Sequence, residues 1–236
     1  MARIAAWLVH AYTATGGIIG MFALLAAAAG EVRLAFILLG ITTLIDASDG
    51  FLARRARVSQ VLPHFSGARM DDVIDVLTFV WVPVFIMASQ NLLPHPLWIA
   101  VPVLAALYAY GQVNMKTEDA FFLGFPSYWN VVALYLFWLR PEPAIAVLMV
   151  VAPGVLSFIP TRYLYPSKNT LLWKTSWTFG LLWAALVLVL LTQPAPDERL
   201  VWLSLAYPAY YLIASFIVDW QLRRQQRRAQ LSAVGD

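Results

Sequence analysis

The chain has 236 residues, of which 61% are hydrophobic and only 12% are charged, with a formal net charge of +3. A soluble domain is nearer half apolar and a quarter charged, so this composition excludes a soluble globular protein and indicates an integral membrane protein. The chain contains no cysteine, which excludes disulfides and thiolate metal sites.

Eight apolar runs follow one another along the chain, and most approach the roughly 20 residues that cross a bilayer as a helix. The first run is too long for a signal peptide and has no clean cleavage site, so we interpret it as a span. The predicted spans cover residues 5–29, 32–53, 71–92, 96–113, 127–140, 142–160, 170–193 and 199–220. We therefore expect an all-α integral membrane protein, with a transmembrane catalytic domain over residues 1–222 and a basic cytoplasmic tail over residues 223–236.

The positive charges are distributed unevenly between the two sets of loops that these spans create. Arg33, Arg140 and Arg199 fall on one side, and the other 13 of the 16 lysines and arginines fall on the opposite side. The larger group comprises Arg3, Arg54, Arg55, Arg57, Arg69, Lys116, Arg162, Lys168, Lys174, Arg223, Arg224, Arg227 and Arg228. Because lysine and arginine are retained in cytoplasmic loops, both termini are predicted to be cytoplasmic.

Four aspartates stand at the cytoplasmic ends of the second and third spans. Asp46 and Asp49 are three residues apart, and Asp71 and Asp75 are four apart, spacings that place each pair on one helix face. Ionised carboxylates at membrane depth are costly and usually mark a functional site. Hard oxygen ligands favour Mg²⁺, Mn²⁺ or Ca²⁺, and four carboxylates suit two divalent ions that act on a phosphoryl group.

A simpler interpretation is that the aspartates pair with neighbouring arginines, namely Arg54, Arg55, Arg57 and Arg69. The small residues around the acids favour the functional interpretation, because Gly50, Ala53 and Gly67 would leave room for a ligand near the backbone. Glycine inside a helix costs about 1 kcal/mol relative to alanine, although helix packing also uses small residues. Arg54 offers a planar donor group suited to phosphate.

The order Asp46-x-x-Asp49-Gly50-x-x-Ala53-Arg54, followed by Gly67-x-x-x-Asp71-x-x-x-Asp75, resembles the signature of the CDP-alcohol phosphotransferases. The insert of 12 residues, 55–66, is longer than is usual in that family and resembles the bacterial phosphatidylcholine synthase branch. Further stretches resemble the same branch: AWLVHAYTATGG, VLPHFSGARMDDVIDVLTF, KTEDAFFLGFPSYWNVV and FIPTRYLYPS.

This resemblance implies a six-helix catalytic core, often dimeric, with an active site open to the cytoplasm. It implies that Asp46, Asp49, Asp71 and Asp75 bind two divalent ions, Mn²⁺ or Mg²⁺, and that Asp75 is also the general base. It further implies that Gly50, Ala53, Arg54 and Gly67 line the nucleotide pocket. The implied reaction joins the phosphatidyl group of CDP-diacylglycerol to choline and releases CMP. A bacterial inner membrane location, a homodimer and no nucleic-acid partner are expected.

The motif does not specify the acceptor alcohol. A quaternary ammonium group binds to aromatic faces, and Tyr128, Trp129 and Tyr163, together with Glu118, could supply such a site, although interfacial belts also use these residues. Thr13 lies within plausible reach of the nucleotide. Serine, inositol phosphate or glycerol phosphate remain alternative acceptors, and Arg162 and Lys116 could begin a pocket for an anionic one.

Two other classes of membrane protein also carry intramembrane acids. An ion-coupled transporter would place them near the midplane of the bilayer, often with internal repeats, whereas here they gather at one end and no repeat is visible. A membrane prenyltransferase would lack the Gly-x-x-Ala-Arg element and would usually carry a second, distant aspartate motif, which does not occur after Asp75.

Overall fold

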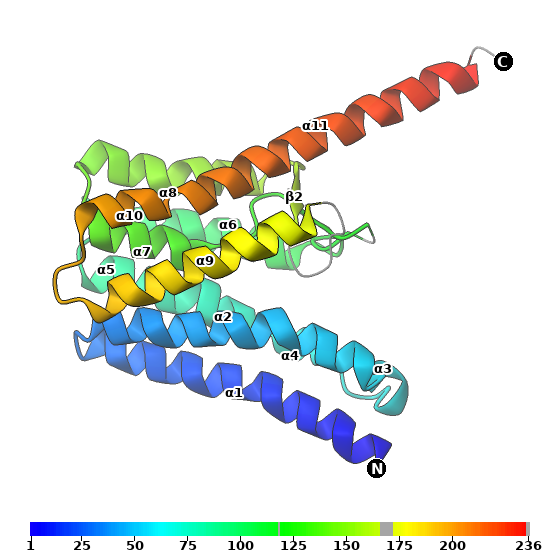
Figure 1. Cartoon of the computed structure of the whole chain (residues 1–236), viewed down its shortest axis with the longest axis horizontal. Helices are drawn as coiled ribbons and strands as arrows, with labels where there is room; N and C mark the ends of the chain where they lie inside the picture. The colour runs from blue at the N-terminus through cyan, green and yellow to red at the C-terminus, as the bar shows by residue number, and fades with distance from the viewer. Residues whose placement is uncertain (118, 166–171, 235–236) are drawn as a thin grey trace.

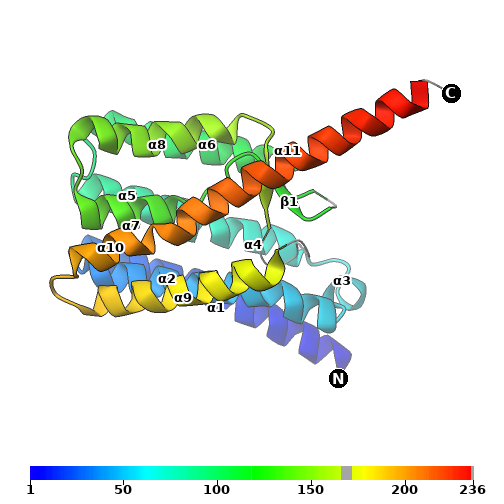
Figure 2. The same cartoon turned by 45° about the horizontal axis from the view of Figure 1, so that its top comes forward.

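The computed structural model describes residues 1–117, 119–165 and 172–234. Four parts of the predictions fall outside these residues: Glu118 of the proposed choline site, Lys168 of the cytoplasmic charges, residues 170–171 of the seventh predicted span, and residues 235–236 of the predicted tail. The described residues form a bundle of helices whose long axes run in broadly the same direction (Figures 1 and 2). In chain order the helices are α1 (Ala2–Ala28), α2 (Val32–Arg55), α3 (Val58–Val61), α4 (Gly67–Asp75), η1 (Val76–Trp81), α5 (Val82–Ser89), η2 (Pro96–Ile99), α6 (Ala100–Gly111), α7 (Trp129–Leu139), α8 (Pro143–Ser157), α9 (Trp173–Thr192), α10 (Glu198–Ser204) and α11 (Ala206–Val234).

Five helical stretches of the described chain are long and apolar enough to cross a membrane: Ala2–Ala28, Val32–Arg55, Gly67–Ser89, Trp173–Thr192 and Glu198–Arg228. Three of the predicted spans, 96–113, 127–140 and 142–160, instead lie on the shorter apolar helices Pro96–Gly111, Trp129–Leu139 and Pro143–Ser157. The helical, multi-pass character of the chain is therefore supported, and the count of eight crossings stays a prediction.

Local backbone geometry explains why the fifth predicted span is short. Helix α7 has 11 residues and ends at Arg140, whose φ of 42° is in the left-handed region. It begins after Pro126 and Ser127, and Ser127 has a φ of 56°. Residues with positive φ do not continue a right-handed helix, so the apolar run of 127–140 is cut at both ends.

The third span is a single helical rod made of α4, η1 and α5. It begins after Ser66, whose side chain accepts a hydrogen bond from the Arg69 backbone N–H, as an N-cap residue does. Directly after Asp75 the rod widens into the π-helix η1. Pro83 follows at the start of α5 and has no N–H to donate to the preceding turn, which disfavours a regular α-helical pattern there.

Two short strands form a small antiparallel sheet that the sequence did not predict. Strand β1 (Phe121–Leu123) pairs with β2 (Arg162–Leu164), so that Phe122 faces Tyr163. On the other edge of β1, Lys116 forms a bridge with Phe122. Non-local pairing of three-residue strands leaves little trace in the sequence, because the segments are too short for a periodic pattern.

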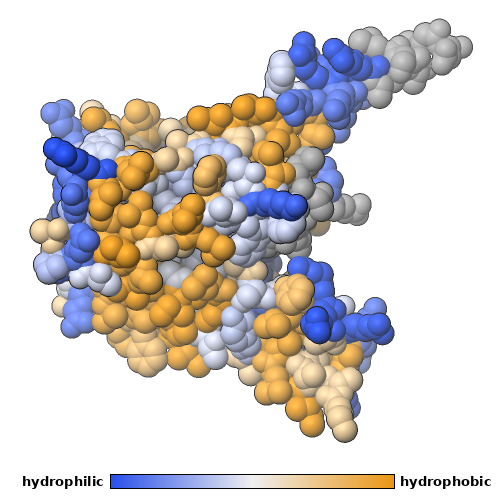
Figure 3. Space-filling model, viewed as in Figure 1, coloured by the Kyte–Doolittle hydropathy of each residue, from blue (hydrophilic) through white to orange (hydrophobic). Residues whose placement is uncertain are grey.

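The main apolar core lies where α1, α2, α5, α6, α7 and α8 meet. Both termini lie at the same end of the bundle as α3 and the strands (Figures 1 and 2). Figure 3 shows apolar side chains over the body of the bundle, and hydrophilic ones along one end and on parts of the projections at the other. This distribution is typical of a protein whose middle faces lipid and whose ends face water.

Candidate active site

The four motif aspartates converge between helices α2 and α4, near the end of the bundle that carries α3. Carboxylate oxygens of Asp46, Asp49 and Asp71 all lie within 4.8 Å of one another, and so do oxygens of Asp71, Asp72 and Asp75. Asp71 belongs to both groups, so the two groups form one cluster. The spacing of three and four residues keeps each pair on one face of its helix, and the packing of α2 beside α4 brings the two faces together.

Two of the four carboxylates are deeply buried, and one of them has a hydroxyl partner on α1. Asp49 and Asp75 are each only 7% exposed. The Thr13 Oγ1 donates a hydrogen bond of 2.8 Å to Oδ2 of Asp49. A small cavity between the three helices is lined by Thr13, Gly16, Thr42, Ile45, Asp46, Asp49, Asp71, Ile74, Asp75 and Thr78. Several buried anions that lie this close together require a compensating positive charge.

Lys116 supplies the positive charge that faces this cluster. Its Nζ lies 3.6 Å from Asp71 Oδ2, 3.3 Å from Asp72 Oδ1 and 3.9 Å from Asp75 Oδ2. Burial alone lowers the pKa of Lys116, but the neighbouring acids, with Asp75 first, outweigh burial and raise the pKa above its usual value. The ammonium group is therefore charged throughout the neutral pH range.

The donor set of this cluster fits divalent cations. Every ligand atom is a carboxylate oxygen, and the oxygens of each group are close enough to meet at one ion. Mg²⁺ and Mn²⁺ prefer such hard ligands. The alternative pairing of the aspartates with Arg54, Arg55, Arg57 and Arg69 does not occur among the ion pairs of the described residues, in which the cluster pairs with Lys116 instead.

Comparison with known proteins reveals related chains that match most of this one. It is 34% identical over 211 residues to a phosphatidylcholine synthase of Pseudomonas aeruginosa, a match that covers 88% of this chain and 89% of the relative. It is 35% identical over 225 residues to a phosphatidylcholine synthase of Legionella pneumophila, covering 90% and 88% of the two chains. A phosphatidylcholine synthase of Bradyrhizobium diazoefficiens is 41% identical over 191 residues, 79% of this chain and 71% of that one.

The chain belongs to the phosphatidylcholine synthase family. This confirms the resemblance noted in the sequence. No family model matches the chain.

In this member of the phosphatidylcholine synthase family, the residues that are expected to bind the nucleotide differ from one another in how closely other side chains surround them. A Cβ added at Gly50 would meet only Nη1 of Arg54, at 3.3 Å, so the face above Gly50 is open apart from that side chain. A Cβ at Gly67 would lie 2.7 Å from Cε1 of His10, so Gly67 also serves helix packing. Ala53 packs against the small cluster of Ala6, Val58 and Leu62. Their role in nucleotide binding stays a prediction.

The aromatic residues expected to bind choline are divided between two clusters: Trp129 lies in the main apolar core, whereas Tyr163, with Tyr128 packed against it, lies in a cluster with residues of α11. Trp129 and Tyr163 are fully buried. Tyr128 is half-buried, with its ring centroid 6.2 Å from that of Phe79 and 5.6 Å from that of Tyr211. Tyr128 is thus the candidate nearest to η1, the helix that follows Asp75, whereas Trp129 and Tyr163 pack inside the protein.

Sequence reasoning missed the contact between Lys116 and the acidic cluster. The sequence indicates Lys116 as a cytoplasmic charge and as the start of a pocket for an anionic acceptor, and its hydrogen bond to Asp72 spans 44 residues. Thr13 was placed near the nucleotide without its partner Asp49, which is 36 residues away. Neither contact leaves a periodic signal, because each depends on how distant helices and loops pack.

Proposed function

We propose that this protein is a membrane phosphatidylcholine synthase that transfers the phosphatidyl group of CDP-diacylglycerol to choline and releases CMP. The convergence of the four motif aspartates into one cluster carries this proposal. Relatives named phosphatidylcholine synthase, which match about nine-tenths of the chain, support the choice of acceptor.

Asp46, Asp49, Asp71 and Asp75 would hold two divalent ions, Mn²⁺ or Mg²⁺. When bound, such ions supply Lewis-acid stabilisation of the negative charge on the phosphates. Gly50 would leave space for the CDP group, and Ala53 on the same helix and Gly67 beside His10 would line the same pocket. Arg54 would donate hydrogen bonds to phosphate oxygens, a geometry that suits its planar guanidinium group.

Asp75 would act as the general base. Its carboxylate accepts the proton of the choline hydroxyl group, and the hydroxyl oxygen attacks the phosphorus that bears diacylglycerol. A new oxygen–phosphorus bond forms, and the bond from that phosphorus to the bridging oxygen of CMP breaks, so that CMP leaves with the bonding electrons. Positioned proton transfer of this kind contributes about 10²–10⁴-fold to a rate.

The membrane setting follows from the lipid substrate. We propose eight crossings in a bacterial inner membrane, with a six-helix catalytic core, both termini and the aspartate cluster on the cytoplasmic side. The acyl chains would stay in the bilayer while the head group reacts at the interface. The bias of positive charge toward this end of the spans supports the orientation.

An anionic acceptor such as glycerol phosphate is the second candidate, because Lys116 places a cation beside Asp75. Such a cation would attract a phosphate-bearing alcohol. The names of the relatives favour choline.

The proposal is tested with purified protein, CDP-diacylglycerol, Mn²⁺ and a panel of alcohols. We expect CMP release that depends on choline and stops when a chelator removes the divalent ions. Release with serine, inositol phosphate or glycerol phosphate but not with choline would contradict the assigned acceptor. Turnover that continues unchanged in excess chelator would contradict the assigned role of the aspartates.

A further inference from the structure

The edge of strand β2 that faces away from β1 is covered by side chains of helix α11. Asp219 Oδ1 accepts a hydrogen bond of 3.1 Å from the Arg162 backbone N–H, and Ser215 Oγ accepts one of 3.1 Å from the Leu164 N–H. The Tyr211 hydroxyl donates to the Leu164 carbonyl oxygen at 2.8 Å. Residues 211, 215 and 219 are four apart and share one helix face. This face therefore satisfies backbone groups that a neighbouring strand would otherwise pair.

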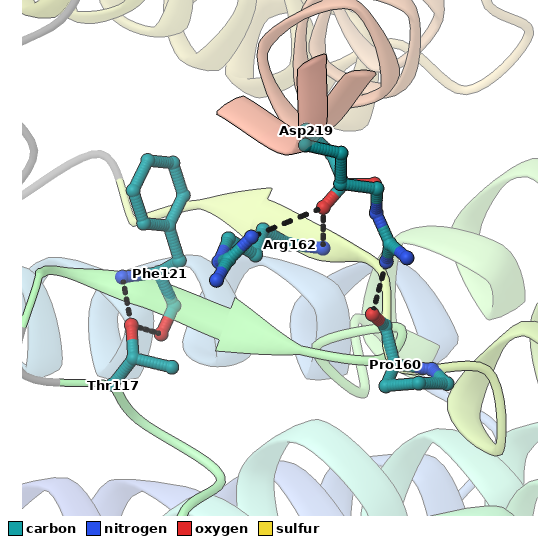
Figure 4. Close-up of polar contacts among 6 residues, drawn as sticks. Thr117, Phe121, Pro160, Arg162 and Asp219 are labelled. Carbon is teal, nitrogen blue, oxygen red and sulfur yellow. Dashed lines mark hydrogen bonds and ion pairs between the residues drawn. The ribbon is translucent and has the colours of Figure 1, made fainter. Parts of the chain in front are cut away.

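Asp219 is the charged member of this face and is only 7% exposed. Arg223 donates from Nε to Asp219 Oδ2 at 2.6 Å, and from Nη2 to the Pro160 carbonyl oxygen at 2.6 Å. Nη1 of Arg162 lies 3.9 Å from Oδ1 of Asp219. Figure 4 shows Asp219 above strand β2, with dashed lines from its carboxylate to Arg162. A buried carboxylate with several charged partners is costly to disturb, so this contact fixes β2 against α11.

The contacts continue from β2 to the aspartate cluster. Strand β2 pairs with β1, and β1 pairs on its other edge with residues 115–117. On that edge the Thr117 N–H donates to the Phe121 carbonyl oxygen at 2.8 Å, and Leu123 N–H donates to Met115 at 3.0 Å. We call residues 115–117, β1 and β2 together the strand layer. Lys116 lies in the segment 115–117 of this layer, and its ammonium group contacts three of the clustered carboxylates.

We propose that Asp219 is a positioning residue that acts on the active site through the strand layer, by holding Lys116 against the aspartate cluster. Lys116 balances part of the negative charge of these carboxylates. The same ammonium group, on a flexible stem, would contact a phosphate of the nucleotide-linked lipid once that lipid binds. The statement about the lipid rests on the proposed function, whereas the contact between α11 and Lys116 does not.

The absence of native cysteine allows a test that needs no catalysis. Lys116→Cys introduces a single thiol at the end of the strand layer, and its rate of modification by a water-soluble maleimide reports how often that end opens. Adding Asp219→Ala should raise this rate about tenfold, since hydrogen bonds to a charged group are lost. Val113→Cys, at a position that is 99% exposed and outside the strand layer, should react at the same rate with and without Asp219→Ala.

Measurements of activity provide the second part of the test. In the otherwise native chain, Asp219→Ala should raise the KM for CDP-diacylglycerol and lower turnover with choline. In a Lys116→Met background, adding Asp219→Ala should cause little further loss, because the group that it positions is already gone. Asp197→Asn, which replaces an acid at the other end of the bundle with another good helix cap, should leave activity unchanged in both backgrounds.

Equal modification rates at position 116 with and without Asp219→Ala would overturn the proposal. So would an equal loss of activity in both backgrounds, because that result indicates a general structural role. If Asp219→Ala does not fold, Ser215→Ala carries the same two measurements. A native chain without choline-dependent CMP release would refute the proposed function, while the modification rates would still test the contact between α11 and Lys116.

Discussion

Asp75 combines burial, a neighbouring ammonium group and a place in the acidic cluster. Asp75→Asn keeps the size of the side chain but removes the proton acceptor and one anionic ligand. We expect turnover with choline to fall by about 10²-fold or more, while binding of CDP-diacylglycerol is partly kept. Measurements of CMP release and of lipid binding on the same sample separate the two effects. Full activity in the variant would remove the assignment of Asp75 as the base.

Thr13 is the residue whose hydroxyl group orients Asp49 from a neighbouring helix. Partners that orient a metal ligand commonly change affinity by about 10–100-fold when they are removed. Thr13→Val should therefore raise the Mn²⁺ concentration needed for half-maximal activity by about tenfold, with little change in maximal rate. Thr13→Ser retains the hydroxyl group and is the matched control. Direct titration of Mn²⁺ binding checks the result, and an unchanged affinity would contradict it.

The residue scale also shows what the sequence could predict of the site. The spacing of Asp46 with Asp49, and of Asp71 with Asp75, was enough to predict that each pair shares one helix face, and the family resemblance implied that the two pairs meet. The partners Lys116 and Thr13 come from segments far away in the chain. Their contacts depend on tertiary packing, which leaves no periodic pattern in a single sequence.

At the scale of elements, the junction between β1 and α7 depends on Gly124. Gly124 has a φ of 80°, and a Cβ there would clash with the Ser157 carbonyl oxygen. Gly124→Ala should lower the free energy of unfolding by about 2 kcal/mol or more, because both the backbone and the space disfavour a side chain. Thermal unfolding of the protein in detergent measures this loss of stability.

Gly40→Ala is the control for that experiment. Gly40 lies inside α2, and a Cβ there would meet nothing within 4 Å. Alanine favours a helix by about 1 kcal/mol over glycine, so stability should be unchanged or slightly higher. Equal melting temperatures for Gly124→Ala and the native chain would contradict the role of Gly124.

The long helices could be predicted because their apolar runs are longer than those of helices buried inside soluble proteins. Within the described residues, the largest differences lie at the shorter helices and the strands. Positive φ at Ser127 and Arg140 shortens α7, and such turns have no unique sequence signal without glycine. The tail predicted from residue 223 onward continues α11 to Val234, because apart from Ser232 residues 221–234 contain only good or moderate helix formers and no breaker.

For the whole molecule, orientation in the membrane is a separate prediction. Single cysteines at Ser59 and Val113 are expected on the cytoplasmic side, and those at His95 and Glu142 on the other side, because 13 of the 16 lysines and arginines fall on the side of the first two. An impermeant thiol reagent applied to spheroplasts should label only positions 95 and 142. Applied to inverted vesicles, it should label only positions 59 and 113. Labelling of positions 59 and 142 from the same face would contradict the topology.

The π-helical turn of η1 lies directly after the proposed base. A π turn contains about one residue more than an α turn, and each α-helical residue rotates the chain by about 100°. The wider turn takes up one extra amino acid without changing the phase of the helix on either side, so deleting a single residue there would leave an ordinary α turn. The aspartates before the turn and the buried residues of α5 after it would keep nearly the same directions, and the deletion would remove only the widened backbone beside Asp75.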